Sequence, residues 1–230
     1  MTSYAGFPPE LPKYLSRLAA HNTKPWFDEH RADYERCYLE AAKDFVQALT
    51  PRLASVMPGL KAEPLLNRSI RRLNRDTRFA KDKTPYKTHL HLTFWLGASP
   101  KAAPAFHFVV AADHIAAGAG LWAVSPGQLD RYRRVLAEPK AARDLAKRLA
   151  ETEEAGAGEP IGPALKRVPA GFDPAAPHAD LARHKGIAVG RSDPIPAWLF
   201  EPAAVDEVVR RFSALAPVVR WLDRHGFTAA

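Results

Sequence analysis

The densest cluster of side chains able to bind an anion lies in residues 68–87, RSIRRLNRDTRFAKDKTPYK. Eight lysines and arginines face two aspartates there, which gives this segment +6 of the whole-chain formal charge of +8. A guanidinium group is planar and permanently charged, and it suits two-pronged contacts with phosphate or carboxylate. Arginines without enough acids nearby therefore indicate either a bound anion or a distant acidic surface.

We predict a ligand site for a phosphate-containing anion in this segment, with Tyr86 as a hydrogen-bond donor beside the cations. Its predicted binding residues are Arg72, Arg75, Arg78, Lys83, Tyr86 and Lys87. Four further cations would complete a basic cleft if the fold brings them to the same place: Arg133, Lys166, Arg167 and Lys185. The alternative is a scatter of separate solvated charges. A converged cleft would fit a small phosphate-bearing molecule or a nucleic-acid backbone.

The two aspartates of the segment, Asp76 and Asp82, are the candidates for a catalytic acid or base or for a metal ligand. A carboxylate among arginines is more often their structural counter-ion, with its pKa held low by the neighbouring positive charge. We favour the counter-ion interpretation for both. The pattern is consistent with catalysis and with simple binding, and the sequence leaves open whether a cofactor is used.

Histidines form a second, weaker cluster. Residues 88–96 alternate between apolar and polar types, so His89 and His91 share one face of a predicted strand, and His107 could lie on its neighbour. Imidazoles so placed can bind a metal. We favour a structural role and predict no metal site.

The segment containing Arg75 and Lys87 also carries a recognisable signature, R-D-x-R-F-A-x-D-K-T-P-Y-K. It resembles the signature of a widespread family defined only as a domain of unknown function. Three further blocks of the family pattern have counterparts along nearly the whole chain: Leu15, Leu18, Asn22, Trp26 and Phe27; Gly120, Trp122, Pro126, Leu129 and Arg133; Leu165, Lys166, Arg167, Pro169, Gly171, Phe172 and Lys185. Ala80 replaces the family's usual serine, and His21 replaces the first of its paired asparagines. The resemblance implies no particular activity.

Composition sets the broad class. The chain has 230 residues and 47% hydrophobic residues, enough for one large domain with a core, so we expect a single domain over residues 1–230. Cys37 is the only cysteine, so no intrachain disulfide and no cysteine-based zinc site can form. No segment has the pattern of a signal peptide or the roughly 18 apolar residues of a membrane span. We therefore expect a cytoplasmic protein without a membrane partner; its oligomeric state is left open.

Periodicity predicts the elements. Apolar residues at helical spacing indicate amino-terminal helices up to Val56, with Pro51 kinking or restarting the last one, and closing helices over residues 202–222. Residues 88–96 predict a strand, and residues 105–112 and 115–121 predict a hairpin. Ser125 should cap a helix, a second helix should cover residues 139–150, and residues 187–190 should form a late strand. Residues 151–163 read as a solvated acidic loop without a site.

The predicted fold class is thus α+β, with a central antiparallel or mixed sheet packed by amino-terminal and carboxy-terminal helices. The leading functional hypothesis is binding of a phosphate-containing anion in a basic cleft. Two alternatives come from other classes: a sequence-independent nucleic-acid-binding protein, and a non-enzymatic scaffold that docks an acidic protein partner.

Overall fold

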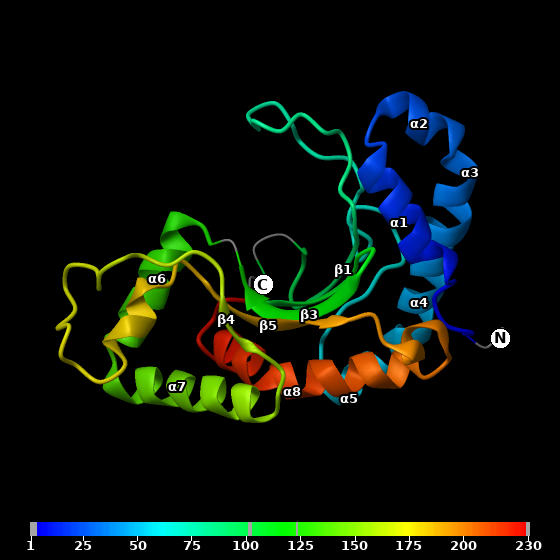
Figure 1. The fold of residues 1–230 in the computed structure, drawn as a ribbon. Helices are drawn as coiled ribbons and strands as arrows, with labels where there is room; N and C mark the ends of the chain where they lie inside the picture. Colours follow the sequence, from blue (N-terminus) through cyan, green and yellow to red (C-terminus); the bar gives the residue numbers. More distant parts are fainter. Residues whose placement is uncertain (1–3, 101–102, 123, 229–230) are drawn as a thin grey trace.

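The computed structural model describes residues 4–100, 103–122 and 124–228, and its amino-terminal part is helical (Figure 1). The predicted long helix of this region is divided: a π-helical segment precedes α4, and Pro51 lies in a short 3-10 turn. The helical segments are α1 (Glu10–Ala20), α2 (Lys24–Glu29), α3 (Arg31–Asp33), the π segment (Tyr34–Glu40), α4 (Ala41–Leu49), the 3-10 turn (Thr50–Arg52) and α5 (Leu53–Val56). They form a column at one end of the sheet.

A five-stranded sheet occupies the centre, and all its strand pairs are antiparallel, in the order β1-β2-β3-β5-β4. This confirms the predicted class, and the predicted hairpin is β2-β3. The strands are β1 (Leu90–Trp95), β2 (Ala105–Val110), β3 (His114–Leu121), β4 (Glu159–Ile161) and β5 (Ile187–Pro194). Residues 69–71 run along the outer edge of β1, where the Arg71 amide donates to the His91 carbonyl at 3.0 Å.

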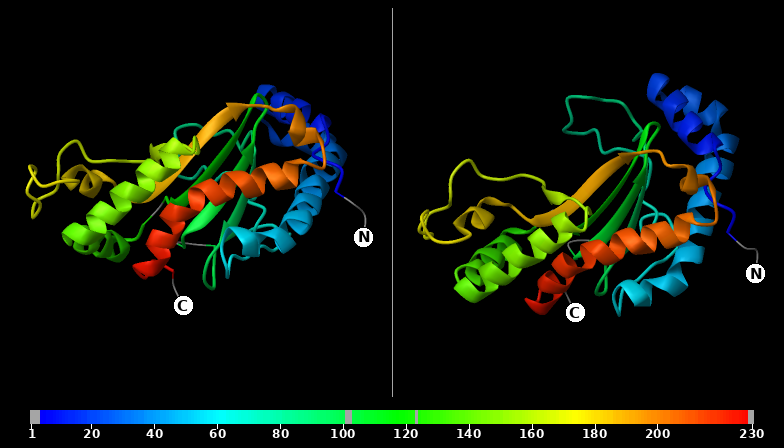
Figure 2. Two further views of the ribbon diagram at one scale, coloured as in Figure 1. Left: turned by 90° about the horizontal axis from the view of Figure 1, so that it is seen from below. Right: turned by 60° about the horizontal axis from the view of Figure 1, so that its bottom comes forward.

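One face of the sheet is covered by helices. The helices after β3 are α6 (Pro126–Leu136), α7 (Pro139–Glu154) and α8 (Ala204–Arg224), and two short 3-10 turns cover Ala179–Arg183 and Ala197–Phe200. α8 is a single closing helix, and it continues through Pro217. Its Phe212 packs against Phe94 and Phe106, with ring centroids 5.5 and 5.1 Å apart. Figure 2 shows α7 and α8 side by side on this face of the sheet.

The alternation of β1 explains which face the helices cover. Leu90, Leu92 and Phe94 belong to the hydrophobic core, whereas His91 and Thr93 lie on the other face. Ser125 caps α6 as predicted, and its side chain and that of Gln128 form a reciprocal capping box. Local sequence thus determined both the strand's orientation and the start of the helix.

The prediction of a solvated loop over residues 151–163 was wrong in two respects. α7 continues to Glu154, and Glu159–Ile161 form the edge strand β4, paired with β5. The glycines permit this pairing: Gly158 has φ +122°, and a Cβ built there would lie 2.2 Å from the Gly190 carbonyl oxygen. The glycine at this position thus allows a close approach of two backbones.

Candidate functional site

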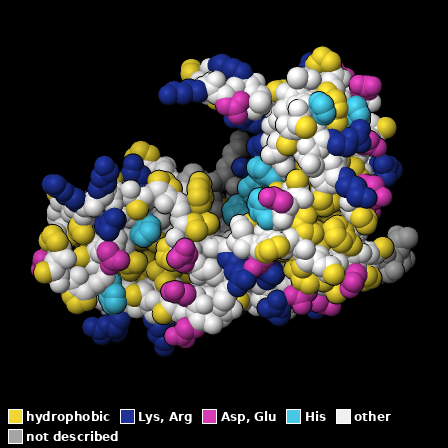
Figure 3. Space-filling view, viewed as in Figure 1, with side chains coloured by type: hydrophobic (Ala, Val, Ile, Leu, Met, Phe, Trp, Pro, Cys, Tyr) yellow, Lys and Arg dark blue, Asp and Glu magenta, His cyan; other side chains and the backbone are white. Residues whose placement is uncertain are grey.

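The second face of the sheet is hollow. It forms the floor of a cavity of about 1080 Å³, a volume near the upper end for small-molecule sites. The floor consists of small residues on the central strands, including Ala105, Ala116, Gly118, Gly120 and Gly190. We call this cavity the open-face pocket. Figure 3 shows the hollow, with histidine side chains along one side.

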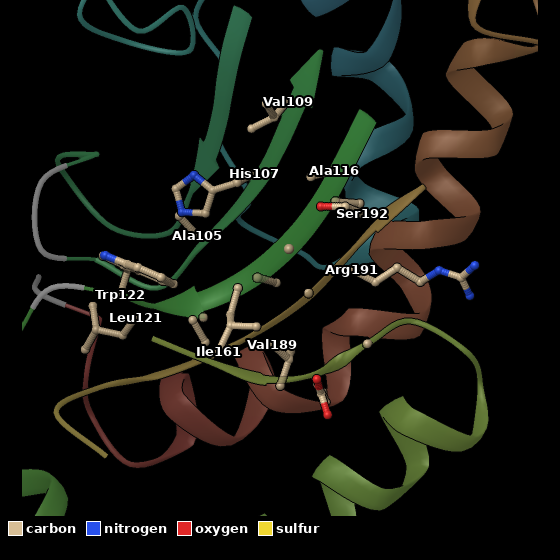
Figure 4. A pocket seen from close by; sticks show the side chains of 18 of the residues that line it. Ala105, His107, Val109, Ala116, Leu121, Trp122, Ile161, Val189, Arg191 and Ser192 are labelled. Atoms are coloured by element: carbon tan, nitrogen blue, oxygen red, sulfur yellow. The ribbon is translucent and has the colours of Figure 1, made fainter. Parts of the chain in front are cut away.

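An apolar wall rises at the end of β3. Trp122 directly follows the strand, and its ring lies beside Gly162, which comes directly after β4. The Trp122 side chain is unusually accessible for an aromatic residue, with 53% of its surface exposed. Figure 4 shows His107, Trp122 and Ile161 projecting around the space above the floor. A flat apolar group could therefore contact the floor and this wall together.

Positive and titratable side chains gather at another wall. Arg71, His91 and His107 line the pocket, and Lys87 and His89 lie next to them. Burial lowers the pKa of both His89 and His91, and the positive charge of Lys87 adds to this effect. We call these five residues the basic corner. β1 contributes His91, and β2 contributes His107. Lys87 and His89 come just before β1, and Arg71 belongs to the segment that runs along the outer edge of β1.

His91 and His107 form a hydrogen-bonded pair. The His91 Nε2 and His107 Nδ1 atoms are 3.0 Å apart, and the Thr93 hydroxyl oxygen lies 3.3 Å from the same His107 nitrogen. Burial lowers the pKa of His91 to about 2, helped by His107, His89, Arg71 and Lys87. Burial and Arg71 lower the pKa of His107 to about 4. Both rings are therefore neutral at about pH 7.

The cations of the basic corner have no acidic partner among the described residues. Arg71 makes no side-chain ion pair there, and the Lys87 ammonium donates only to the Arg72 backbone carbonyl, at 3.1 Å. Burial, with Arg71 and Arg72 nearby, lowers the pKa of Lys87. Partly buried positive charge without a carboxylate favours an anionic ligand.

The signature segment forms a protruding arm, residues 74–86, which rises above the hollow face of the sheet (Figure 1). Most of its cations form ion pairs or hydrogen bonds with other residues of the arm. Arg75 donates to Asp82 at 2.5 Å and to the Thr84 side chain and carbonyl. Arg78 pairs with Asp76 at 2.7 Å, and the Lys83 ammonium donates to the Thr77 carbonyl at 2.9 Å.

Both aspartates of the arm are the counter-ions that the sequence favoured. Hydrogen bonds from Arg78 lower the pKa of Asp76. Hydrogen bonds from Thr84 and Arg75 lower the pKa of Asp82 to about 2. A carboxylate held ionised in this way is a poor general base near neutral pH. These ion pairs agree with the counter-ion interpretation of the two residues.

Tyr86 anchors the arm to the amino-terminal helices. Its ring is only 6% exposed and stacks on Phe27 of α2, with centroids 4.4 Å apart. The Asn22 amide donates to the Tyr86 carbonyl at 2.9 Å and accepts from the Tyr86 backbone N–H at 3.0 Å. Asn22, the retained asparagine of the amino-terminal pattern, thus fixes the signature's tyrosine.

The more distant predicted cations do not join the arm in one cleft. Lys166 and Arg167 line a separate small pocket together with Arg183. Arg133 lies on α6, and its Nε atom is buried without a hydrogen-bond partner in the described structure. Lys185 is exposed just before β5, and Arg72 is exposed near the base of the arm. Of the predicted ligand residues, Lys87 belongs to the basic corner.

Sequence reasoning missed Arg71 and Trp122 as site residues, and it placed His91 and His107 in a weak metal-binding hypothesis. The alternation of residues 88–96 was the available signal, because it put the histidines on the face opposite the core. In the part of the chain that the structure describes, no three histidine, cysteine, aspartate or glutamate side chains are grouped as metal ligands.

Together, these features define an α+β protein with one helix-covered face and one open, ligand-sized face. The chain belongs to the family described as conserved hypothetical protein (DUF2461), whose model matches residues 10–221. Comparisons with curated proteins and with solved structures found no match. Within the described residues, no helix is both long and apolar enough to span a bilayer.

Proposed function

We propose that this protein binds a small organic anion in the open-face pocket, with the acidic group at the basic corner and an apolar body on the sheet floor. One observation carries the proposal: Arg71 at the wall of a large cavity, and Lys87 next to it, have no acidic partner among the described residues and lie beside two neutral histidines. An anionic group there would replace water around partly buried cations. A phosphate ester, a sulfonate and a carboxylate share this chemistry.

The floor supports an apolar body for the ligand rather than a bare inorganic ion. The small methyl groups of alanines and the lack of side chains at glycines leave space directly above the strands, and Trp122 offers an accessible aromatic surface at the edge. Burying apolar surface contributes roughly 25 cal/mol per Å². A planar molecule resting on the floor would gain this contribution while its charge meets Arg71.

A dye titration tests the proposal. Anilinonaphthalene sulfonate, a fluorescent aromatic sulfonate, should bind with a stoichiometry near one and brighten in the pocket. Arg71→Gln removes the cation and Ala116→Trp fills the floor, so each should weaken binding at least about tenfold, or about 1.4 kcal/mol. Arg134→Gln, at an exposed position on α6, is the matched control and should bind as the wild type does.

Thermal melts of the three variants would verify that they fold. Equal dye binding by the wild type, Arg71→Gln and Ala116→Trp would refute a site at this pocket. Inorganic phosphate should compete only weakly with the dye, because it lacks the apolar body. Strong competition would restrict the ligand to the basic corner and contradict the role of the floor.

A second candidate function, sequence-independent binding of single-stranded nucleic acid, has one specific observation in its favour. Phe79 at the tip of the arm is 95% exposed, and the Arg78 guanidinium lies 5.9 Å from its ring centroid. Exposed aromatic residues beside cations are the elements on which unpaired bases stack. This function predicts retention on single-stranded DNA or RNA that weakens steeply with salt and is lost in Phe79→Ser. Retention unchanged in Phe79→Ser would exclude the arm as the contact.

A further inference from the structure

We infer that the open-face pocket takes up its anion together with one proton, and that the His91–His107 pair accepts that proton. The inference rests on the proposed function and concerns the same pocket. It identifies the bound species as the equivalent of a neutral acid: an anion and a proton held side by side.

Two neutral imidazoles carry two N–H groups on four nitrogens. One N–H lies in the contact between His91 Nε2 and His107 Nδ1, which are 3.0 Å apart. The second N–H must be on the outer nitrogen of the ring that accepts the shared hydrogen bond. The other outer nitrogen, either His91 Nδ1 or His107 Nε2, is then bare and able to accept a proton.

The pair can accept one proton without losing its hydrogen bond. Filling the bare outer nitrogen leaves the shared N–H···N contact intact and produces one imidazolium. A second proton would place N–H groups on both facing nitrogens and break that contact. The geometry therefore limits uptake to one proton for each bound anion, and no bond other than N–H forms.

The charged surroundings explain why the proton arrives only with an anion. His91 lies near His107 on β2. It is also near three groups at the β1 edge of the sheet: His89, Arg71 and Lys87. His107 faces Arg71 and His91, and His114 on β3 acts on His89. Each of these groups is a cation or a titratable base, and together with burial they keep the pair neutral.

A bound anion would reverse this balance. An opposite charge within about 4–6 Å favours the charged form of a titratable group and moves its pKa by about 1–3. Starting from a pKa of about 4 for His107, such a shift would bring protonation of the pair toward the physiological range. Binding of the anion and of the proton would then strengthen each other reciprocally.

Calorimetric titration with anilinonaphthalene sulfonate counts the protons. The sulfonate stays ionised in this range, so any proton taken up must go to the protein. Titrations at about pH 6 in two cationic buffers with different protonation enthalpies, such as bis-Tris and imidazole, give the number of protons from the difference in heat. We expect uptake of up to one proton and an affinity that rises by up to about tenfold for each unit of falling pH.

Two variants assign the proton. The double variant His91→Gln/His107→Gln should still bind the dye through Arg71 but lose the uptake, because neither imidazole of the pair remains to accept the proton. His30→Gln, at the end of α2 and outside the pocket, is the control and should keep it. Dye binding without proton uptake by the wild type would overturn this inference and leave the proposed function standing, whereas absence of dye binding would overturn both. Uptake that persists in the His91→Gln/His107→Gln double variant would refute the assignment to the pair.

Discussion

At the scale of single residues, the same types of side chain have different roles according to their partners. Arg75 and Arg78 of the arm pair with Asp82 and Asp76, so their charge is used in building the arm. Arg71 has no such partner in the described structure and lines the pocket. Unpaired, partly buried charge is the better indicator of a ligand site. The density of arginines alone did not distinguish the two cases.

The neutral histidine pair predicts a loss of stability in acid. The pKa values of His91 and His107 are lower in the folded protein than the ordinary value of about 6.5, so the unfolded chain binds more protons below that pH. The free energy of unfolding should therefore fall as the pH drops from about 6.5 to about 4, by up to about 1.4 kcal/mol per pH unit for each proton.

Urea denaturation at several pH values measures this effect. His107→Gln removes one of the two groups, so its stability should decrease less steeply over the same pH range. His30→Gln, at the end of α2 and outside the pocket, serves as the control and should leave the slope unchanged. An identical slope in His107→Gln and the wild type would show that the buried pair does not control acid sensitivity.

Asn22 should contribute more to the free energy of unfolding than an ordinary polar residue does, because its amide hydrogen-bonds both the backbone N–H and the backbone C=O of Tyr86. Asn22→Ala leaves a partly buried N–H and C=O without these partners and should lower the free energy of unfolding by about 1–3 kcal/mol. Asn22→Asp keeps the acceptor and loses the donor, so an intermediate loss is expected. A change below about 0.5 kcal/mol in Asn22→Ala would mean that water replaces the amide readily.

At the scale of elements, the sequence predicted those whose signals are local. The alternation of residues 88–96 identified β1 and its two faces, and Ser125 identified the start of α6. The edge strand β4 was missed because its three residues carry no alternation of their own and its pairing with β5 depends on contacts distant in sequence. The convergence of the predicted cations failed for a related reason: spacing along the chain does not determine which segments meet in space.

The pairing of β4 with β5 can be tested through the glycine that permits it. Gly158→Ala puts a side chain on a residue with φ +122°, and its Cβ would lie within 2.2 Å of a carbonyl oxygen. The substitution should therefore lower the free energy of unfolding by more than about 1 kcal/mol. Gly127, in the first turn of α6, has open space around the position that a Cβ would occupy, and Gly127→Ala should be neutral or stabilising.

Thermal melting of the two alanine variants gives the comparison directly. Gly158→Ala should also weaken dye binding, since Gly158, Glu159 and Ile161 line the open-face pocket. If both variants melt at the wild-type temperature, the close approach at Gly158 does not constrain the edge of the sheet.

At the scale of the whole molecule, the covering of the sheet is asymmetric. α7 and α8 bury one face, while the other presents a floor of small residues between the basic corner and the wall at Trp122, with the arm above it (Figures 1 and 4). A sheet face of this width is normally covered or solvated by polar side chains. Its small, largely apolar floor fits the ligand that we propose, and the net charge of +8 fits an anionic one.

The most direct test of anion binding in the open-face pocket is a crystal structure of the protein with bound anilinonaphthalene sulfonate. We expect the sulfonate within about 2.7–3.2 Å of the Arg71 guanidinium, beside His107, and the aromatic rings on the floor near Ala116. Dye bound only elsewhere, such as in the small pocket of Lys166 and Arg167, with the open-face pocket empty, would contradict the proposed site.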